Sequence, residues 1–317
     1  MKNSHLTCFR GSVISSCCGD YMDFYNSIKE LLIDSELTKR AKDYSKNRSE
    51  VLTYYNVGKL LKEAGNYYGE GVIKKYSEKL VTEVGKKYND RTLRRMRQIY
   101  FLFEKQKWSP AATKLSISHY TELLPLKNIN EINYYIDICK RNNLTRDELR
   151  DRIKNKEYLR LDENTRNKIV NNDELELVDT VKNPILIRNT IGNYDITEKM
   201  LQKLILENLN EFLDELGEGY SYVKNEYKIK IGNSYNYIDL LLFNYIYNAF
   251  VVVELKVTEL KKEHIGQTLV YMNYIDENIK SVSQNKTIGI IIVKVDNKFV
   301  MHYYKEGRMI SREYELI

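Results

Sequence analysis

The chain has 317 residues, enough for about two domains, and 43% of them are hydrophobic, which suffices for buried cores. A net charge of +6 is compatible with a polyanionic partner such as nucleic acid. No apolar run reaches the roughly 18 residues of a membrane span, which argues against a membrane protein. The four cysteines lack the spacing of a zinc site or of a disulfide framework. We therefore expect a cytoplasmic protein in a reducing compartment.

The first half of the chain predicts helices. Residues 1–21 lack helical periodicity, and we expect a disordered tail there. Residues 22–160 predict an all-helical domain, since no strand-like alternation interrupts them. The apolar stripes and glycine stops place its first three helices around Tyr25–Leu32, at 51–65 and at 71–84.

Two later helices in this half have recognisable N-terminal signals. One begins at Asn89 or Asp90, either of which is a good N-cap. Its expected buried face consists of Leu93, Met96, Tyr100 and Phe103. The other opens at Thr145, where Glu148 completes a capping box.

The second half has a different pattern. Residues 161–183 are polar and predict a linker, and residues 184–317 predict a second domain. Its expected elements, in order, are a helix at 196–216, three strands at 220–231, 237–243 and 249–256, a helix at 258–279, and strands at 287–294 and 298–304. Three successive strands favour an antiparallel meander, and the crossover helix allows a parallel addition. The chain as a whole is therefore expected to be α+β, with a mixed sheet flanked by helices.

Charged residues interrupt two of the apolar strands. Asp239 lies in the run Tyr237–Phe243, and Glu254 and Lys256 lie two residues apart in the next run. Alternation puts Glu254 and Lys256 on one face, and places Ile238, Leu240 and Leu242 opposite Asp239. Three charged groups can share such a position if they converge on a cation and on each other.

This pattern predicts a metal-dependent phosphodiester hydrolase. Asp239 and Glu254 offer hard oxygen ligands that suit Mg²⁺ or Mn²⁺, and the carbonyl of Leu255 is a further candidate ligand. Lys256 could stabilise charge on the phosphate or position the attacking water. The alternative is a buried ion pair between strands without a metal, which the spacing alone leaves open.

Two further groups of polar residues are candidates. Gln267 and Tyr271 lie one turn apart on the next predicted helix and could contact phosphate, although a lone Gln more often bonds to backbone. The second group surrounds the helix after Asn89 and is basic: Lys86, Lys87, Arg91, Arg94, Arg95 and Arg97. Such a helix predicts contacts with nucleic acid, and an ordinary solvated face is the alternative.

Taken together, these segments resemble the YhcG-like family of the PD-(D/E)XK nuclease superfamily, over about residues 24–317. The matching segments of the second half are Phe212–Tyr220, Tyr237–Phe243, Val252–Lys256, Gly266–Gln267, Tyr271–Asn273 and Thr287–Ile290. Those of the first half are Tyr54–Gly58, Tyr68–Gly69, Leu93–Gln98 and Leu115–His119.

The resemblance implies a helical DNA-binding or targeting domain followed by a restriction-endonuclease-like αβββαβ domain with a mixed sheet. It implies that Asp239, Glu254 and Lys256 form the catalytic core, with Gln267 as an auxiliary residue and Mg²⁺ as the cofactor. Two positions depart from the family pattern: Gln202 stands where an acid is expected, and Glu226 where a Gln is expected. Glu198 and Glu207 are the nearby acids that could substitute for the first.

The favoured hypothesis is therefore a divalent-metal-dependent endonuclease acting on DNA. By analogy, double-strand cutting suggests a homodimer. Two alternatives stay open: an inactive nuclease fold that binds nucleic acid, and a subunit whose helical half binds a protein partner.

Overall fold

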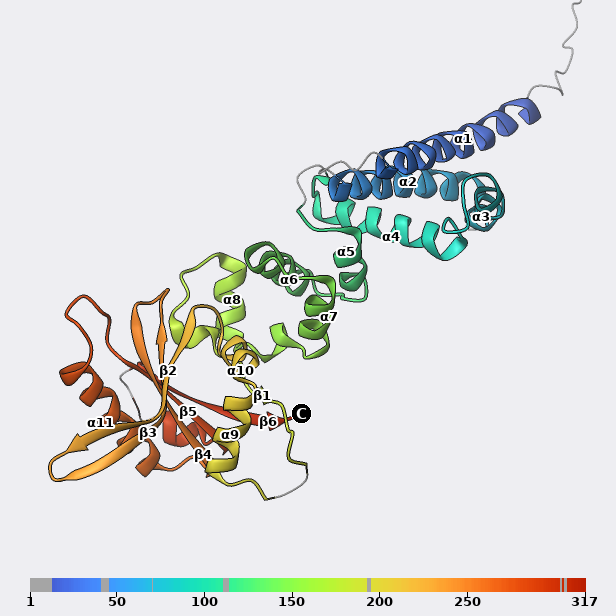
Figure 1. Cartoon of the computed structure of the whole chain (residues 1–317). Helices are drawn as coiled ribbons and strands as arrows, with labels where there is room; N and C mark the ends of the chain where they lie inside the picture. Colours follow the sequence, from blue (N-terminus) through green and yellow to red (C-terminus); the bar gives the residue numbers. More distant parts are fainter. Residues whose placement is uncertain are drawn as a thin grey trace, which may run out of the picture. The chain divides into compact units, whose positions relative to one another are not determined.

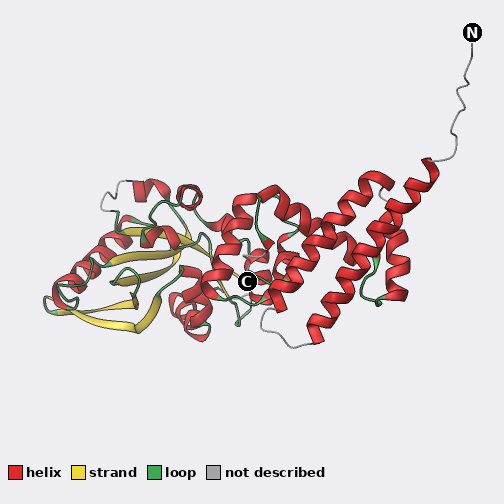
Figure 2. Cartoon of the chain, turned by 90° about the horizontal axis from the view of Figure 1, so that it is seen from above, coloured by secondary structure: helices red, strands yellow, loops and turns green. Residues whose placement is uncertain are grey.

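The structure, a computed structural model, describes residues 13–40, 46–69, 71–110, 114–192, 195–302, 304 and 307–317. The chain divides into two compact units, Met1–Lys154 and Asn155–Ile317 (Figure 1). The described residues of the first unit form only helices and loops, and the strands all belong to the second (Figure 2). None of the described helices has both the length and the apolar character of a membrane span.

Seven helices follow one another in the described part of the first unit. They are α1 (Val13–Arg40), α2 (Lys46–Tyr68), α3 (Val72–Glu83), α4 (Asp90–Gln106), α5 (Ile117–Leu123), α6 (Ile129–Asn142) and α7 (Arg146–Lys154). Of the expected tail, residues 1–12 lie outside the described residues, whereas residues 13–21 belong to α1. The tail prediction is therefore wrong for its second half.

Helix α2 packs closely on α4 at Gly58. Gly58 on α2 lies so near α4 that a Cβ atom there would stand 2.4 Å from the Met96 carbonyl oxygen. The predicted buried face of α4 is confirmed, because Leu93, Met96, Tyr100 and Phe103 are all buried. Asn89 caps this helix by accepting a hydrogen bond from the Thr92 N–H at 3.0 Å.

The second unit begins with short helical segments and continues into a sheet. Its first elements are η2 (Glu157–Arg160), α8 (Glu163–Asn171), η3 (Leu177–Thr180), β1 (Ile185–Ile187), α9 (Glu198–Glu207) and α10 (Leu209–Leu216). Those that follow are β2 (Tyr220–Ile231), β3 (Ser234–Asn244), β4 (Ala249–Glu259), α11 (Lys262–Asn278), β5 (Ile288–Val295), α12 (Lys298–His302) and β6 (Met309–Leu316).

The six strands found among the described residues form one mixed sheet in the order β1-β6-β5-β4-β3-β2. The predicted meander is confirmed, since β3 pairs antiparallel with both β2 and β4. After the crossover through α11, β5 adds to β4 in parallel, also as predicted. The remaining pairs, β5 with β6 and β6 with β1, are parallel and involve two strands that the sequence pattern did not indicate.

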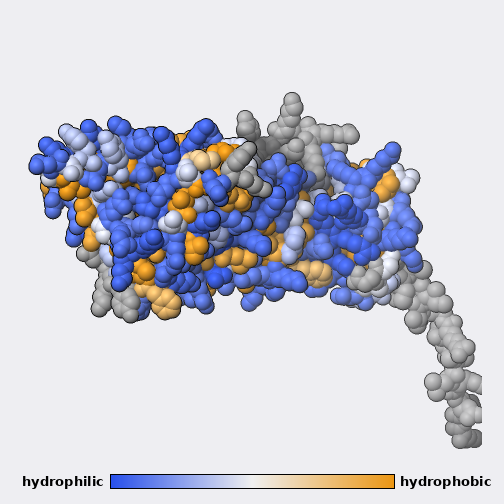
Figure 3. All heavy atoms as spheres, turned by 90° about the horizontal axis from the view of Figure 1, so that it is seen from below, coloured by the Kyte–Doolittle hydropathy of each residue, from blue (hydrophilic) through white to orange (hydrophobic). Residues whose placement is uncertain are grey.

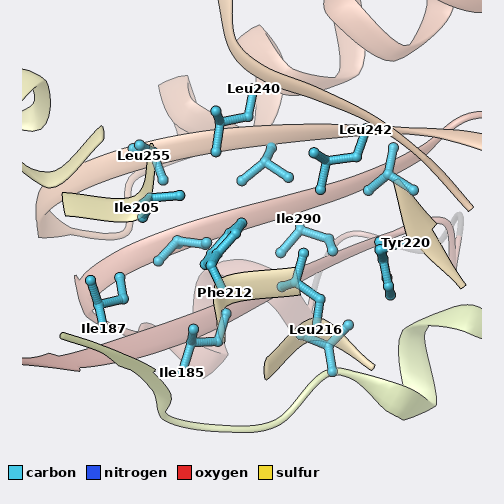
Figure 4. Packing of buried hydrophobic residues seen from close by; sticks show 14 of the residues in the cluster. Ile185, Ile187, Ile205, Phe212, Leu216, Tyr220, Leu240, Leu242, Leu255 and Ile290 are labelled. Carbon is cyan, nitrogen blue, oxygen red and sulfur yellow. The ribbon is translucent and has the colours of Figure 1, made fainter. Parts of the chain in front are cut away.

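Helices cover both faces of this sheet. On one face, Ile205 of α9 and Phe212 and Leu216 of α10 point into a cluster with strand residues such as Leu242 (Figure 4), and Leu201 of α9 belongs to the same cluster. On the other, α11 packs its residues Tyr271, Met272 and Ile275 over Leu241, Val252 and Ile291. Most of these apolar side chains are thus buried in the two clusters. On the face drawn in Figure 3, the hydrophobic residues form small separate groups.

Three expectations for this half were wrong. The segment 161–183 contains α8 and η3, and its Leu177 and Val181 are buried in the main core, so it is not a linker. The single helix expected at 196–216 is interrupted at Asn208, whose side-chain amide donates to the Leu204 carbonyl at 3.2 Å and competes with the backbone ladder. Residues 298–302 form helix α12 instead of a strand.

Candidate active site

The predicted charged residues meet where the pairing of β3 with β4 ends. The outermost backbone pair is Leu240 with Val253, so Asp239 and Glu254 are the next residues of the two strands. Oδ2 of Asp239 accepts a hydrogen bond from the backbone N–H of Leu255 at 2.8 Å. The Asp239 carboxylate therefore reaches across to β4, as the sequence predicted.

Glu254 and Lys256 form a buried ion pair on β4. Lys256 Nζ lies 2.8 Å from Oε1 of Glu254, and the two residues are only 9% and 2% exposed. The second carboxylate oxygen of Glu254, Oε2, is buried and has no hydrogen-bond partner among the described residues. A buried polar atom without a partner is costly, so this oxygen is suited to receive a ligand.

Helix α9 adds two residues at this point. Oε2 of Glu198, in the first turn of α9, lies 3.6 Å from Lys256 Nζ. One turn later, the side-chain amide of Gln202 donates to the Asp239 carbonyl oxygen at 2.9 Å. Glu207 instead accepts a hydrogen bond from Thr190 at 2.9 Å. Of the two acids considered as substitutes at the Gln202 position, Glu198 is therefore the one at the site.

The electrostatics of the site are those of crowded, buried charges. Burial, followed by repulsion from Asp239, raises the pKa of Glu254 to about 7. Burial also raises the pKa of Asp239, against the hydrogen bond from Leu255. For Lys256, burial lowers the pKa, but the pairing with Glu254 outweighs it, and the net pKa is raised. The ammonium group of Lys256 therefore keeps its proton at neutral pH.

Glu226 on β2 is a further acid beside the site. The pairs Asn225–Leu240 and Tyr227–Ile238 flank it, so it stands across from Asp239 and contributes to raising the Asp239 pKa. Glu226 has a left-handed backbone, with φ of 46°. On β3, Ile238 packs with the α11 cluster while Leu240 and Leu242 pack with the opposite one. The strict alternation that we predicted for β3 is therefore interrupted at Asp239.

Gln267 and Tyr271 are neighbours on α11, and the burial of Tyr271 contradicts the nucleic-acid contact that we predicted for it. The Gln267 side-chain amide donates to the Tyr271 hydroxyl at 2.8 Å. Tyr271 is only 4% exposed and packs in the core under α11, so its ring is not available to a nucleic acid as we had expected. Its hydroxyl instead fixes the orientation of Gln267.

The donor set fits a divalent cation of the Mg²⁺ type. Asp239 and Glu254 supply carboxylate oxygens, one of them buried without a partner. The N–H of Leu255 faces Asp239, and the N–H and C=O of one strand residue point to the same edge, so the Leu255 carbonyl faces the same region. The described residues contain no group of three or more His, Cys, Asp or Glu side chains in metal-binding geometry.

The basic residues around α4 belong to the first unit and are partly neutralised. Arg94 bonds to Asp90 at 2.8 Å, and Lys87 pairs with Glu36. Three other residues of this group, Lys86, Arg91 and Arg95, form no ion pair with any described residue. Arg97 lies over the ring of Phe101 at 5.9 Å. About half of the predicted basic surface therefore stays available to a polyanion.

Two family models match the chain. The YhcG PDDEXK nuclease domain matches residues 178–314, and the DUF1016 N-terminal domain matches residues 30–160. Among curated proteins, "Putative nuclease YhcG" of Escherichia coli (strain K12) is 22% identical over 337 aligned positions, which cover 90% of this chain and 88% of that protein.

Two solved structures share a more limited likeness. A repair endonuclease from Pyrococcus abyssi gives a TM-score of 0.27 at 19% identity, over 39% of this chain. A complex named EndoMS-dsDNA2 gives a TM-score of 0.30 at 21% identity, over 41% of this chain. The chain spans about half of the length of each, 48% and 49%.

Proposed function

Because the chain belongs to the YhcG-like family and carries its PDDEXK nuclease domain, we propose that it is an endonuclease that hydrolyses DNA phosphodiester bonds with a divalent metal, Mg²⁺ or Mn²⁺. The observation that supports this most directly is the meeting of Asp239, Glu254 and Lys256 at one end of the β3–β4 pair. The family match supports a nuclease, and the DNA substrate and the divalent metal are the further parts of what we propose.

Asp239, Glu254 and the Leu255 carbonyl would hold the cation. When bound there, a divalent cation supplies positive charge that polarises the scissile phosphate and favours deprotonation of water. The buried, unpartnered Oε2 of Glu254 supports this role, since a cation would satisfy it.

The protein side chains perform the remaining tasks. Lys256 places an ammonium group where negative charge develops on the phosphate, and a charge fixed in a buried site is more effective than one in water. The Leu255 N–H and the Gln202 amide hold the Asp239 side chain and backbone in place. Water attacks the phosphorus in line, the bond from phosphorus to the opposite ester oxygen breaks, and the proton that the water loses is balanced by one that the departing oxygen takes up from solvent.

The helical unit would hold the duplex. Lys86, Arg91 and Arg95 are its candidate phosphate contacts. Double-strand cutting needs two active sites, so the homodimer stays part of the proposal.

The test is cleavage of supercoiled plasmid with Mg²⁺ or with EDTA. We expect nicking by the wild type only with Mg²⁺, and losses of at least about 100-fold for Asp239→Asn and Lys256→Ala. Lys286→Ala, at the opposite end of the sheet, is the control and should cut normally. An inactive wild type, or normal cutting by both site variants, would refute the proposal.

Gln202 favours a second candidate, a nucleic-acid-binding protein that does not cut. An amide stands where the family pattern has an acid, and it donates to backbone instead of offering a charge. This candidate predicts salt-dependent DNA binding with no cleavage at any Mg²⁺ or Mn²⁺ concentration.

A further inference from the structure

The hairpin of β2 and β3 has two unlike faces. Toward its tip, Tyr227 pairs with Ile238 and Ile229 with Asn236, and the apolar members of this face pack with the cluster under α11. Between these pairs lie Lys228 with Tyr237 and Lys230 with Tyr235. Because directly paired residues project to the same side of a sheet, Lys228, Lys230, Tyr235 and Tyr237 share the other face.

This second face is open to solvent. Tyr235 and Tyr237 are 57% and 52% exposed, and both lysines are exposed. No ion pair joins Lys228 or Lys230 to a carboxylate within the described parts of the chain. Lys228 stands between the two rings, since it pairs with Tyr237 and its Nζ lies 3.8 Å from the centroid of the Tyr235 ring.

The lysines alone would have an ordinary explanation. β2 is the last strand of the sheet, and lysines on an edge strand prevent it from pairing with another chain. Two exposed tyrosines do not serve that purpose, because adjacent exposed rings promote association instead of preventing it. Alternating rings and cations are, however, the combination by which proteins bind unpaired nucleic acid: bases stack on the rings, and phosphates contact the cations.

The position of this face also fits a substrate contact. Tyr237 precedes Asp239 by two residues on the same strand. Tyr235 and Tyr237 are separated by roughly 6.8 Å along the strand, which is twice the rise per residue and about two stacking layers of bases. A nucleic-acid strand bound along this face would therefore run toward Asp239, the residue of the candidate site that lies on β3.

We propose that this face of the hairpin, made of Lys228, Lys230, Tyr235 and Tyr237, binds an unpaired stretch of nucleic-acid strand, with bases on the two rings and phosphates on the two lysines. The inference rests on the proposed function and deepens it, because it names the substrate class as nucleic acid with an unpaired segment next to the cut.

The experiment measures binding of the full chain to a fluorescein-labelled oligothymidylate, and to a blunt duplex of equal length, by anisotropy in EDTA. We expect Tyr235→Ala and Tyr237→Ala each to weaken single-strand binding about tenfold, with little change for the duplex. Tyr235→Phe and Tyr237→Phe keep the ring and should bind as the wild type does. Tyr245→Ala, which removes a ring that is 66% exposed at the far end of β3, is the matched control.

Replacing the lysines should change a different quantity, the salt dependence of binding. Lys228→Gln and Lys230→Gln should each reduce the slope of log affinity against log salt by about 0.7, the value for one phosphate of a single strand. The tyrosine variants should leave this slope unchanged, and Lys286→Gln should alter neither quantity.

The proposal is overturned if the tyrosine-to-alanine variants bind the single strand normally, or if Tyr245→Ala loses as much affinity as they do. Its failure is distinct from that of the nuclease function. If the wild type cleaves plasmid and the tyrosine-to-alanine variants bind the single strand normally, this inference alone is refuted. Reduced binding by the hairpin variants of a protein that never cuts would refute the nuclease alone.

Discussion

At the scale of residues, Glu254 governs the chemistry of the candidate site. It is almost fully buried, its Oε1 is held by Lys256, and its Oε2 is unsatisfied. Burial and the nearby Asp239 raise its pKa to about 7, far above that of a free glutamate. Protein stability and cation binding should therefore depend on the same proton.

An unfolded glutamate loses its proton near its ordinary pKa of 4.5, whereas folded Glu254 keeps its proton until about pH 7. Between these values the folded state binds more protons, so the free energy of unfolding decreases as pH rises. At about 1.4 kcal/mol per pKa unit, the loss is on the order of 3 kcal/mol.

We therefore expect metal-free wild type to melt at a lower temperature near pH 8 than near pH 5, and Glu254→Gln to lack this part of the difference. Mg²⁺ or Mn²⁺ should restore the melting temperature of the wild type near pH 8, because the cation takes the place of the proton. Thermal unfolding followed by circular dichroism measures both effects. A pH profile identical in wild type and Glu254→Gln would contradict the assignment.

Glu198 offers a second prediction at this scale. Its carboxylate lies near Lys256, whereas Glu207, on the same helix, bonds to Thr190. We expect Glu198→Gln to reduce plasmid cleavage roughly tenfold, about 1.4 kcal/mol in activation free energy, without lowering the melting temperature. Glu207→Gln should cut like the wild type. Equal activities for the two variants would remove Glu198 from the site.

At the scale of elements, the close approach of α2 and α4 determines what the first unit tolerates. A Cβ on Gly58 would lie 2.4 Å from the Met96 carbonyl oxygen and 2.7 Å from the Tyr100 Cβ. Both of these are fixed atoms, so the helices would have to separate. Gly65, two turns later on α2, has its nearest neighbour at 3.4 Å, the flexible end of Arg97.

Gly58→Ala should therefore destabilise the first unit by about 1–3 kcal/mol through overpacking. Gly65→Ala should be neutral or stabilising by up to about 1 kcal/mol, because alanine favours a helix over glycine. Urea unfolding of the two variants distinguishes these effects of the same substitution on one helix. A stable Gly58→Ala variant would show that α2 and α4 do not pack this closely.

Several helix ends could be predicted from the sequence alone. Local signals sufficed where one residue determines an end, as at the Asn89 cap and the Thr145–Glu148 capping box. The pairing of Asp239 with β4 followed from two apolar strands joined by a short turn. The contact of Glu198 with Lys256 could not be predicted, because it depends on how α9 packs against the sheet.

The last twenty residues of the chain show most clearly what could not be predicted from the sequence. Residues 298–304 are rich in β-formers, yet Asn297 caps a helix there by accepting from the Val300 N–H at 3.3 Å. Because β6 runs parallel to β5, the chain must return along the sheet between them, which a hairpin would not permit. β6 itself carries Arg312, buried and bonded to the Val181 carbonyl at 3.0 Å, so its pattern does not alternate like that of a half-exposed strand.

At the scale of the whole molecule, the segment 155–183 belongs with the sheet. Leu177 and Val181 are buried in the main core. The Asp162 carboxylate of this segment accepts a hydrogen bond from Arg312 of β6 at 2.9 Å. A second domain starting at residue 184, as the composition suggested, would lack these contacts. The boundary between the two compact units lies instead between residues 154 and 155 of the chain.

This boundary can be tested with two fragments. We expect residues 155–317 to fold alone with a cooperative melting transition, because the fragment keeps both clusters of its sheet. Residues 184–317 should be insoluble or less stable by several kcal/mol, since burial of each large aliphatic side chain contributes about 1.5–3 kcal/mol. Circular dichroism melts compare them, and equal melting temperatures would place the boundary at residue 184 after all.

β4 has an antiparallel neighbour on one side and a parallel neighbour on the other. To slip by one position, which would turn Glu254 and Lys256 to the opposite face, it would have to break both ladders at once. Glu254 and Lys256 are thereby anchored in a strand that is paired on both sides, whereas the hairpin tip and the helical unit lie outside that double constraint. Such a chain can acquire new targets by changing its periphery and leave the reacting groups where they are.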